Sequence, residues 1–254
     1  MNVSKRRSVY TLYAILIFLF GGDALGADDQ SSDLLPAGLV IEEVFKPGPG
    51  SPVGKIEMVE GQVIIIHTGV LSGYLAEKDL PLFTGDTIVA LESGRISFKL
   101  NDGSTLALAS ETKLVMNRTV FDLAKKSRVS FLSMSLGKAR FLVKKIAGLK
   151  RSEFKVRTPT AVCGIRGSDF ITSVTADSTE ISALSKTVLE VRRLAFPEKP
   201  PVIVKEEDYC PKCGFARVIV KESGVWKVRA SSEEIEETKK LFEIQRWFGR
   251  KKMH

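Results

Sequence analysis

Short runs in which apolar and polar residues alternate begin after residue 52 and recur along the chain. A period of two is the pattern of a β-strand with one buried face, so these runs predict strands. Turn residues such as Glu60-Gly61 and Asn101-Asp102-Gly103-Ser104 separate the runs, which supports this interpretation. In the first half of the chain the predicted strands cover residues 53–59, 62–67, 87–91, 95–100, 105–109 and 113–116.

Glycine opens several of these runs, at Gly61, Gly94, Gly137 and Gly167. Glycine before each strand indicates a chain that turns corners repeatedly, as in a β-sandwich or in a solenoid of stacked coils. We therefore expect a mainly β protein, built as a solenoid-like or sandwich-like stack of short strands. Residues 120–129 break the alternation and predict a short helical or loop excursion, after which strands lie on either side of Gly137.

The second half continues the strand pattern over residues 171–174, 179–192, 202–204 and 217–220. Ser231 then has the character of a helix cap, acids follow in the first turn, and Gly249 is a stop signal. These signals predict a C-terminal amphipathic helix from Ser231 to about Phe248. Its wide apolar side would either dock on the β-domain or contact a partner or a membrane surface.

The N-terminus has the layout of a secretory signal peptide: three basic residues, an apolar run over 9–20, and small residues at Ala24 and Gly26. The run is shorter than the roughly 20 residues of a membrane helix. We expect cleavage near Gly26/Ala27 and an exported, periplasmic protein; an uncleaved N-terminal anchor is the alternative. The predicted organisation is a signal peptide (1–26), a flexible Pro/Gly-rich linker (27–52), a β-domain (53–204), C-terminal strands with a CxxC hairpin (205–230), and the helix with a basic tail (231–254).

The formal net charge is +8, and basic residues gather between Asp122 and Arg157. An exported protein rarely meets nucleic acid, and no aromatic residues interleave these cations as stacking platforms, so nucleic acid is not an expected partner. The alternation predicts that Lys138 and Arg140 lie on one exposed face. The band is either a solvated strand face or a surface for an envelope protein or anionic polysaccharide. Its candidate binding residues are Lys138, Arg140, Lys144, Lys145, Lys150, Arg151 and Lys155.

The stretch from Val156 to Phe170 places Arg166 between Gly164 and Gly167 in an otherwise apolar strand. Glycines on both sides predict a bulge or sharp corner. Arg166 is then either a structural guanidinium that binds Asp169 and turn carbonyls or a contact for a partner. Pro159 lacks a backbone donor, which favours the start of an edge strand.

Two blocks carry a family resemblance. The segment from Gly85 to Leu106 contains Gly85-Asp86 and Asp102-Gly103-Ser104, and the later segment reads T-P-T-A-V-C-G-I-R-G-S-D-F. Together they resemble the FecR domain, over about residues 53–204. The resemblance identifies as motif residues Gly85, Asp86, Asp102, Gly103, Ser104, Thr158, Pro159, Gly164, Arg166, Gly167, Asp169 and Phe170.

The resemblance implies an extracytoplasmic domain of stacked short strands. In the best-known members this domain senses a loaded outer-membrane transporter and passes the signal to a sigma factor. Here only a handful of residues precede the apolar run, so we expect a stand-alone exported domain without the cytoplasmic anti-sigma segment. The predicted function is a non-enzymatic binding or scaffold module of the bacterial envelope, and the alternative is a periplasmic sensor in such a relay.

The chain offers little catalytic chemistry. Cys210 and Cys213 form one C-x-x-C pair, which predicts a local disulfide capping a hairpin. Half a zinc site, free thiols and a thiol or metal protein are alternatives, although a zinc site needs more ligands than one pair supplies. Cys163 is expected to be a buried thiol, and His67 a packed or exposed strand residue. We expect neither an enzyme nor a cofactor or resident metal.

Overall fold

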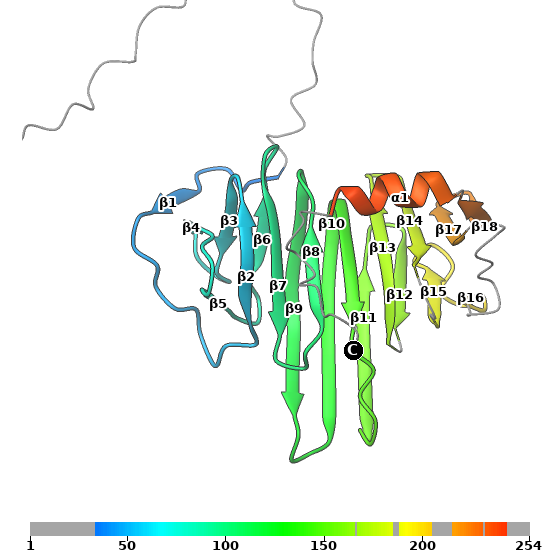
Figure 1. The fold of residues 1–254 in the computed structure, drawn as a ribbon, viewed down its shortest axis with the longest axis horizontal. Helices are drawn as coiled ribbons and strands as arrows, with labels where there is room; N and C mark the ends of the chain where they lie inside the picture. Colours follow the sequence, from blue (N-terminus) through cyan, green and yellow to red (C-terminus); the bar gives the residue numbers. More distant parts are fainter. Residues whose placement is uncertain (1–33, 166, 185–187, 205–214, 231, 243–254) are drawn as a thin grey trace, which may run out of the picture.

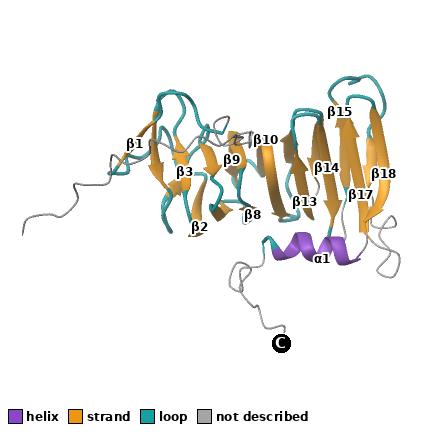
Figure 2. Cartoon of the chain, turned by 90° about the horizontal axis from the view of Figure 1, so that it is seen from above, coloured by secondary structure: helices purple, strands orange, loops and turns teal. Residues whose placement is uncertain are grey.

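The computed structural model describes residues 34–165, 167–184, 188–204, 215–230 and 232–242. Within these residues the chain is mainly β, as the alternation predicts, and its strands form two hydrogen-bonded sheets that run side by side along the long axis of the molecule (Figures 1 and 2). The predicted signal helix lies outside the described residues.

The first sheet runs from one end of the stack to the other. Its order is β1 (Val40–Glu42), β4 (Ser72–Leu75), β3 (Val63–Ile66), β6 (Thr87–Ala90), β9 (Thr112–Asp122), β10 (Ser127–Val143), β11 (Arg151–Arg157), β12 (Ala161–Ile165), β15 (Leu189–Arg193) and β16 (Val202–Val204). All of these pairings are antiparallel except β1 with β4 and β10 with β11.

The second sheet follows the same axis. Its order is β5 (Pro81–Leu82), β2 (Gly54–Glu60), β7 (Arg95–Leu100), β8 (Thr105–Leu108), β10 again, β13 (Ser168–Val174), β14 (Ser178–Ala183), β17 (Phe215–Lys221) and β18 (Gly224–Ala230). The chain enters one sheet, crosses to the other, and returns, so that both sheets grow together.

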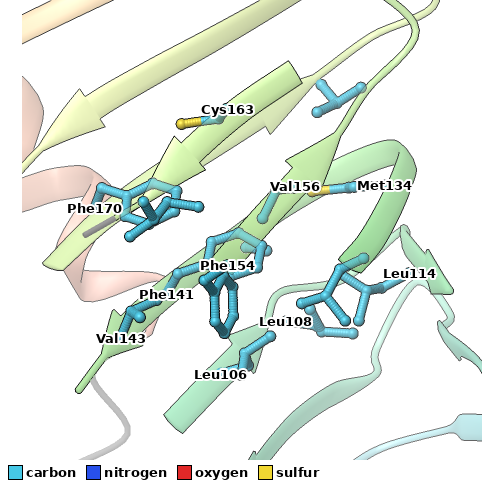
Figure 3. Close-up of a cluster of buried hydrophobic side chains, with 14 of the residues drawn as sticks. Leu106, Leu108, Leu114, Met134, Phe141, Val143, Phe154, Val156, Cys163 and Phe170 are labelled. Atoms are coloured by element: carbon cyan, nitrogen blue, oxygen red, sulfur yellow. The ribbon is translucent and has the colours of Figure 1, made fainter. Parts of the chain in front are cut away.

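The main core consists of the inward residues of both sheets, from Ile56 near one end to Val220 near the other. Every second residue of a strand contributes to it, which is why the alternation along the chain predicts the strands. Near the middle, the rings of Phe141 and Phe170 stack with centroids 4.9 Å apart (Figure 3). Such pairs add about 0.5–1.5 kcal/mol beyond the burial of their area.

The strand β10 belongs to both sheets. Its residues 127–136 pair with β9, and residues 137–143 pair with β8 and β13. Arg128, near its start, donates a hydrogen bond to the carbonyl of Lys144, just beyond its end, so β10 doubles back at Gly137. The prediction of strands on either side of Gly137 is confirmed. The predicted excursion over 120–129 is wrong, because β9 and β10 form a hairpin there.

The segment 34–52, predicted as part of a flexible linker, lies against the first sheet. Leu34 is buried, β1 pairs with β4, and the ring of Phe45 packs edge-on against Tyr74, with centroids 5.4 Å apart. The Pro/Gly-rich composition correctly predicted turns in this segment. It did not predict that the few apolar side chains of the segment pack on the sheet.

The C-terminal helix is shorter than predicted over the described residues. The helix α1 spans Ser232–Lys240, and Leu241 and Phe242 form a turn. Phe242 is fully buried in a small cluster with Ala107, Ala109, Ile171 and Leu184 on the outer face of the second sheet. The predicted continuation from residue 243 to Phe248 lies outside the described residues. No helix of the described residues is long and apolar enough to cross a membrane.

Candidate interaction surfaces

The Thr158-Pro159 corner joins β11 to β12, and its hydroxyl groups are satisfied internally. The buried Thr179 hydroxyl donates to Thr158 Oγ1 (2.6 Å), and Thr160 Oγ1 donates to Thr179 Oγ1 (2.8 Å). The prediction that Pro159 opens an edge strand is wrong, because β12 pairs with both β11 and β15. Pro159 itself lies in the turn before the strand, where no ladder hydrogen bond is needed.

Two positions, Gly137 and the motif residue Gly167, require glycine for steric reasons. Gly137, at the fold-back of β10, has φ +96°, and a Cβ there would lie 2.3 Å from Thr112 Oγ1. Gly167, where the chain crosses from β12 to β13, has φ +80°, and a Cβ would lie 2.7 Å from Lys145 Cβ. These conformations disfavour any side chain, so both residues are needed to turn the chain from one sheet to the other.

The motif carboxylate Asp169 forms a two-pronged ion pair with Arg140, whose Nε and Nη2 donate over 2.9 and 2.8 Å. Both side chains are mostly buried, each about 15% exposed. The expectation that Arg140 is an exposed binding residue is therefore wrong, because its guanidinium holds β10 to β13. The expected partner role of Arg166 toward Asp169 lies outside the described residues.

The Asp102-Gly103-Ser104 turn is tied to a buried arginine. Asp102 accepts hydrogen bonds from the backbone N–H of Ser104 (2.8 Å) and from Arg128 Nη1 (3.3 Å). Arg128 also donates to the Lys144 carbonyl (2.6 Å) and to Ser152 Oγ (2.7 Å), and it is 1% exposed. Counting charge along the sequence placed Arg128 in the basic band, but its position in the strand places it inward with Leu132 and Met134.

The motif residue Asp86 is fully buried beside His67. Asp86 Oδ1 lies 2.7 Å from His67 Nδ1, and Asp86 Oδ2 accepts from the backbone N–H of Phe83. His67 Nε2 donates to the carbonyl of Lys46 (2.9 Å), which fixes the segment before β2. Burial raises the pKa of Asp86, and the bonds from His67 and Phe83 oppose this shift only in part. His67 is thus a packed strand residue, with a hydrogen-bonded partner that the sequence pattern did not identify.

Cys163 faces the core from β12 and is 2% exposed (Figure 3). Burial, with a smaller contribution from the charge of Glu190, raises the pKa of its thiol to about 12. It is free, as predicted. Cys210 and Cys213 lie outside the described residues. Within the described ranges, no group of three or more His, Cys, Asp or Glu side chains could hold a metal ion.

The remaining candidate binding residues do not form one band. Lys138 is exposed on the outer face of the second sheet, whereas Arg151 and Lys155 are exposed on β11 in the first sheet. Both residues on β11 pair with the carboxylate of Glu153, at 2.8 and 3.3 Å. Lys144, Lys145 and Lys150 lie in the loop that joins β10 to β11, and all three are exposed. The basic residues therefore divide into two faces and a loop.

A hollow of about 320 Å³ lies on the first sheet, between β11 and β16. Its lining combines apolar groups with charges of both signs, including Gly164, Lys155, Glu190, Val188 and Ile203. Unlike Gly137 and Gly167, Gly164 has an ordinary φ, and a Cβ there would meet only Glu190, at 3.7 Å or more. The fold does not need glycine at this position, and the missing side chain helps leave the hollow open.

Comparison with known proteins identifies a family match over part of the chain. Residues 86–189 match the model of the family described as FecR protein. Two crystal structures of a "putative anti-sigma factor" from Parabacteroides distasonis show similarity at 17% identity, with TM-scores of 0.43 and 0.44. Each match covers 59% of this chain and 62% of the other, so the chain spans less than two thirds of those proteins. A search of curated proteins found no match.

Proposed function

Because residues 86–189 match the FecR family model, we propose that this chain is a non-enzymatic binding module that holds a partner protein on the outer face of its first sheet. The compartment that we propose is the bacterial periplasm, reached through the predicted signal peptide. Sequencing the N-terminus of the protein recovered from the periplasm tests this: a start near Ala27 supports export, and a retained leader in the membrane fraction supports the anchor.

The observation that carries the proposal is the hollow beside Gly164. Most of the described motif residues are explained by the fold: they turn corners, satisfy buried donors or fill the core. Gly164 is different, because its backbone conformation and its surroundings both accept a side chain. A glycine that the fold does not require is best explained by a surface that must leave room for a binding partner.

The lining of the hollow indicates the chemistry of the partner. Val188, which is 43% exposed, and Ile203 supply an apolar wall, while Lys155 and Glu190 place opposite charges at the rim. An apolar pocket with a polar rim suits a protruding apolar side chain of a protein, since such a side chain gains from leaving water. An anionic polysaccharide, the other partner considered from the sequence, has no protruding apolar side chain that could occupy the hollow.

The test compares the wild-type protein with Gly164→Leu and Gly164→Ala as baits for envelope proteins. Gly164→Leu fills the hollow and should abolish capture of the specific partner, whereas Gly164→Ala should retain part of it. Gly164→Ala should melt at or slightly above the wild-type temperature, because its Cβ meets no atom closer than 3.7 Å, and a thermal melt of Gly164→Leu checks that this variant is folded. A partner captured equally by Gly164→Leu, or displaced by soluble alginate, would contradict the proposed surface.

The match of residues 86–189 to the FecR family model favours a second candidate, a sensor component of a relay from a transporter to a sigma factor. The same capture experiment separates the two. A transporter or a membrane-spanning anti-sigma protein among the specific partners supports the relay, and a gene for such a protein beside this one would add to that support.

A thiol or metal function would rest on Cys210 and Cys213. Native mass and thiol titration distinguish an inert disulfide, which ends this idea, from bound zinc or a reactive dithiol. Cys163 takes no part in such chemistry in the folded state, because burial keeps its thiol protonated.

A further inference from the structure

Two loops meet at one end of the central strands and form a projection that we call the lysine finger: the β9–β10 turn, residues 122–127, and the β10–β11 loop, residues 144–150. The backbone N–H groups of Lys150 and Arg151 both donate to the carbonyl of Lys126, at 2.8 and 3.3 Å. Figure 1 shows the hairpin of β9 and β10 extending past the ends of the neighbouring strands.

The charge of the finger is strongly positive. It carries Lys125, Lys126, Lys144, Lys145 and Lys150, all exposed, against the single carboxylate of Asp122. The carboxylate of Asp122 already has a partner in the same turn: it accepts a hydrogen bond from the backbone N–H of Lys125 (2.9 Å) and lies 3.5 Å from the Nζ of Lys125. The other four lysines have no carboxylate partner in the described part of the chain. Their charge is therefore available to a partner.

Apolar side chains also lie in the finger and beside it. Leu123 is 69% exposed at the turn, Val120 is 44% exposed just behind it, and Ile146 and Leu149 are half-buried in the adjoining loop. An exposed leucine at the end of a projecting hairpin gains nothing from contact with water or with a sugar chain. It gains free energy from a partner that removes it from water.

The buried arginine beneath the finger fixes the two loops relative to each other. Arg128, one residue after the turn, donates to the carbonyl of Lys144 and to Ser152 Oγ, on either side of the loop. Asp102 balances its charge from the neighbouring turn. The lysines and the leucine are thus held on a built support, and binding would order little additional backbone.

From this combination we infer that the lysine finger binds the surface of an anionic phospholipid bilayer. The lysines contact headgroup phosphates, and Leu123 enters the boundary between headgroups and acyl chains. A projection with exposed lysines and an exposed leucine matches a flat anionic surface with an apolar interior. This contact is independent of the hollow beside Gly164, on the outer face of the first sheet, so one surface can fail its test while the other passes.

The direct test reports from the end of the finger. Leu123→Cys is made in the full chain carrying Cys210→Ser and Cys213→Ser, in which the remaining Cys163 is 2% exposed, and the new thiol takes an environment-sensitive fluorophore. With vesicles of equal parts phosphatidylcholine and phosphatidylglycerol, we expect a blue shift that vesicles of phosphatidylcholine alone do not cause. The matched control places the label at the exposed Ser135, near the opposite end of the first half of β10. No shift at 123, or an equal shift at 135, would overturn the inference.

Charge variants provide the second readout. Lys145→Gln with Lys150→Gln should weaken the response at residue 123 by about 30-fold, because each lysine close to an anionic surface contributes about a fivefold factor. Lys78→Gln with Lys221→Gln removes the same charge from exposed positions elsewhere and should leave the response unchanged. Equal losses from both pairs, or displacement of the labelled finger by soluble alginate as effectively as by anionic vesicles, would contradict a specific contact with lipid.

Discussion

At the scale of single residues, the described charged members of the family motif act inside the protein. Arg128 donates a hydrogen bond to Asp102, Arg140 donates one to Asp169, and Asp86 is hydrogen-bonded to His67. All three carboxylates are mostly or fully buried. A carboxylate removed from water needs such partners, since an unpaired buried charge is strongly destabilising. Replacing these residues should therefore affect folding before it affects binding.

The Asp86–His67 pair predicts a pH dependence. His67 Nε2 must donate its proton to the Lys46 carbonyl, so a second proton must lie between His67 Nδ1 and Asp86 Oδ1. Burial raises the pKa of Asp86 above its ordinary 3.8, so the native state binds this proton more tightly than the unfolded state. Its contribution to stability is therefore full at low pH and is lost as the pH rises through the raised pKa.

Two variants separate the proton from the packing. Asp86→Asn can accept from Phe83 N–H and donate to a neutral His67, so its melting temperature should lose the pH dependence that this pair causes. Asp86→Ala leaves buried groups unpaired and should lower the free energy of unfolding by about 1–3 kcal/mol for each. Thermal melts across a pH series check both; an unchanged pH profile in Asp86→Asn would show that the shared proton does not matter.

At the scale of elements, β10 shows how one residue changes the course of the chain. Gly137 lets a single strand leave the first sheet and enter the second. The flanking residues alternate correctly for both sheets, with Met134 before the fold-back and Ala139 after it facing the core. The fold-back therefore depends on the backbone at one position and on no special side chain.

Gly137→Ala should destabilise the protein by at least about 1–3 kcal/mol, because a side chain at φ +96° strains the backbone and the Cβ would meet Glu111 and Thr112 at 2.3–2.5 Å. Gly164→Ala is the matched control. Its melting temperature should stay the same or rise, by up to about 1 kcal/mol in stability, because alanine restricts the unfolded chain. Chemical denaturation measures both, and equal losses at the two positions would contradict the distinction.

Most strands could be predicted because alternation reflects burial between the two sheets. The prediction failed at residues 120–129, where the hairpin extends beyond the core: Val120 is exposed, and the alternation that marks a half-buried strand is lost. The alternation along β10 already predicts that Arg128 faces the core, but counting charges along the sequence takes no account of this alternation. The pairing of His67 with Asp86 joins residues from different strands, and alternation carries no information about such distant contacts.

At the scale of the whole molecule, one continuous core runs through both sheets and includes Cys163. The 2% exposure of Cys163 and its raised pKa predict that thiol reagents reach it only when this core opens. In a Cys210→Ser, Cys213→Ser background at pH 8, labelling should follow the unfolding transition seen by circular dichroism across a denaturant series. Labelling well below that transition would show that the core opens in parts.

The same linkage sets an alkaline limit. A thiol whose pKa rises from 9.0 to about 12 on folding contributes stability that is full below pH 9 and is lost as the pH rises toward 12. Cys163→Ala should remove this contribution to the alkaline loss, although it also leaves a small cavity.

The double membership of β10 has a mechanical consequence. Among the residue-by-residue registers of the described strands, none joins a strand before β10 to a strand after it: β8 and β9 bond to it from one side, β11 and β13 from the other. Within the hydrogen-bonded sheets, a load applied across the two half-stacks therefore passes through the backbone of this single strand. The two arms of β10 lie in different sheets, so such a load would pull on the hydrogen bonds of both sheets at once. A displacement at one end of the stack can reach the other end through the sheets only by moving β10.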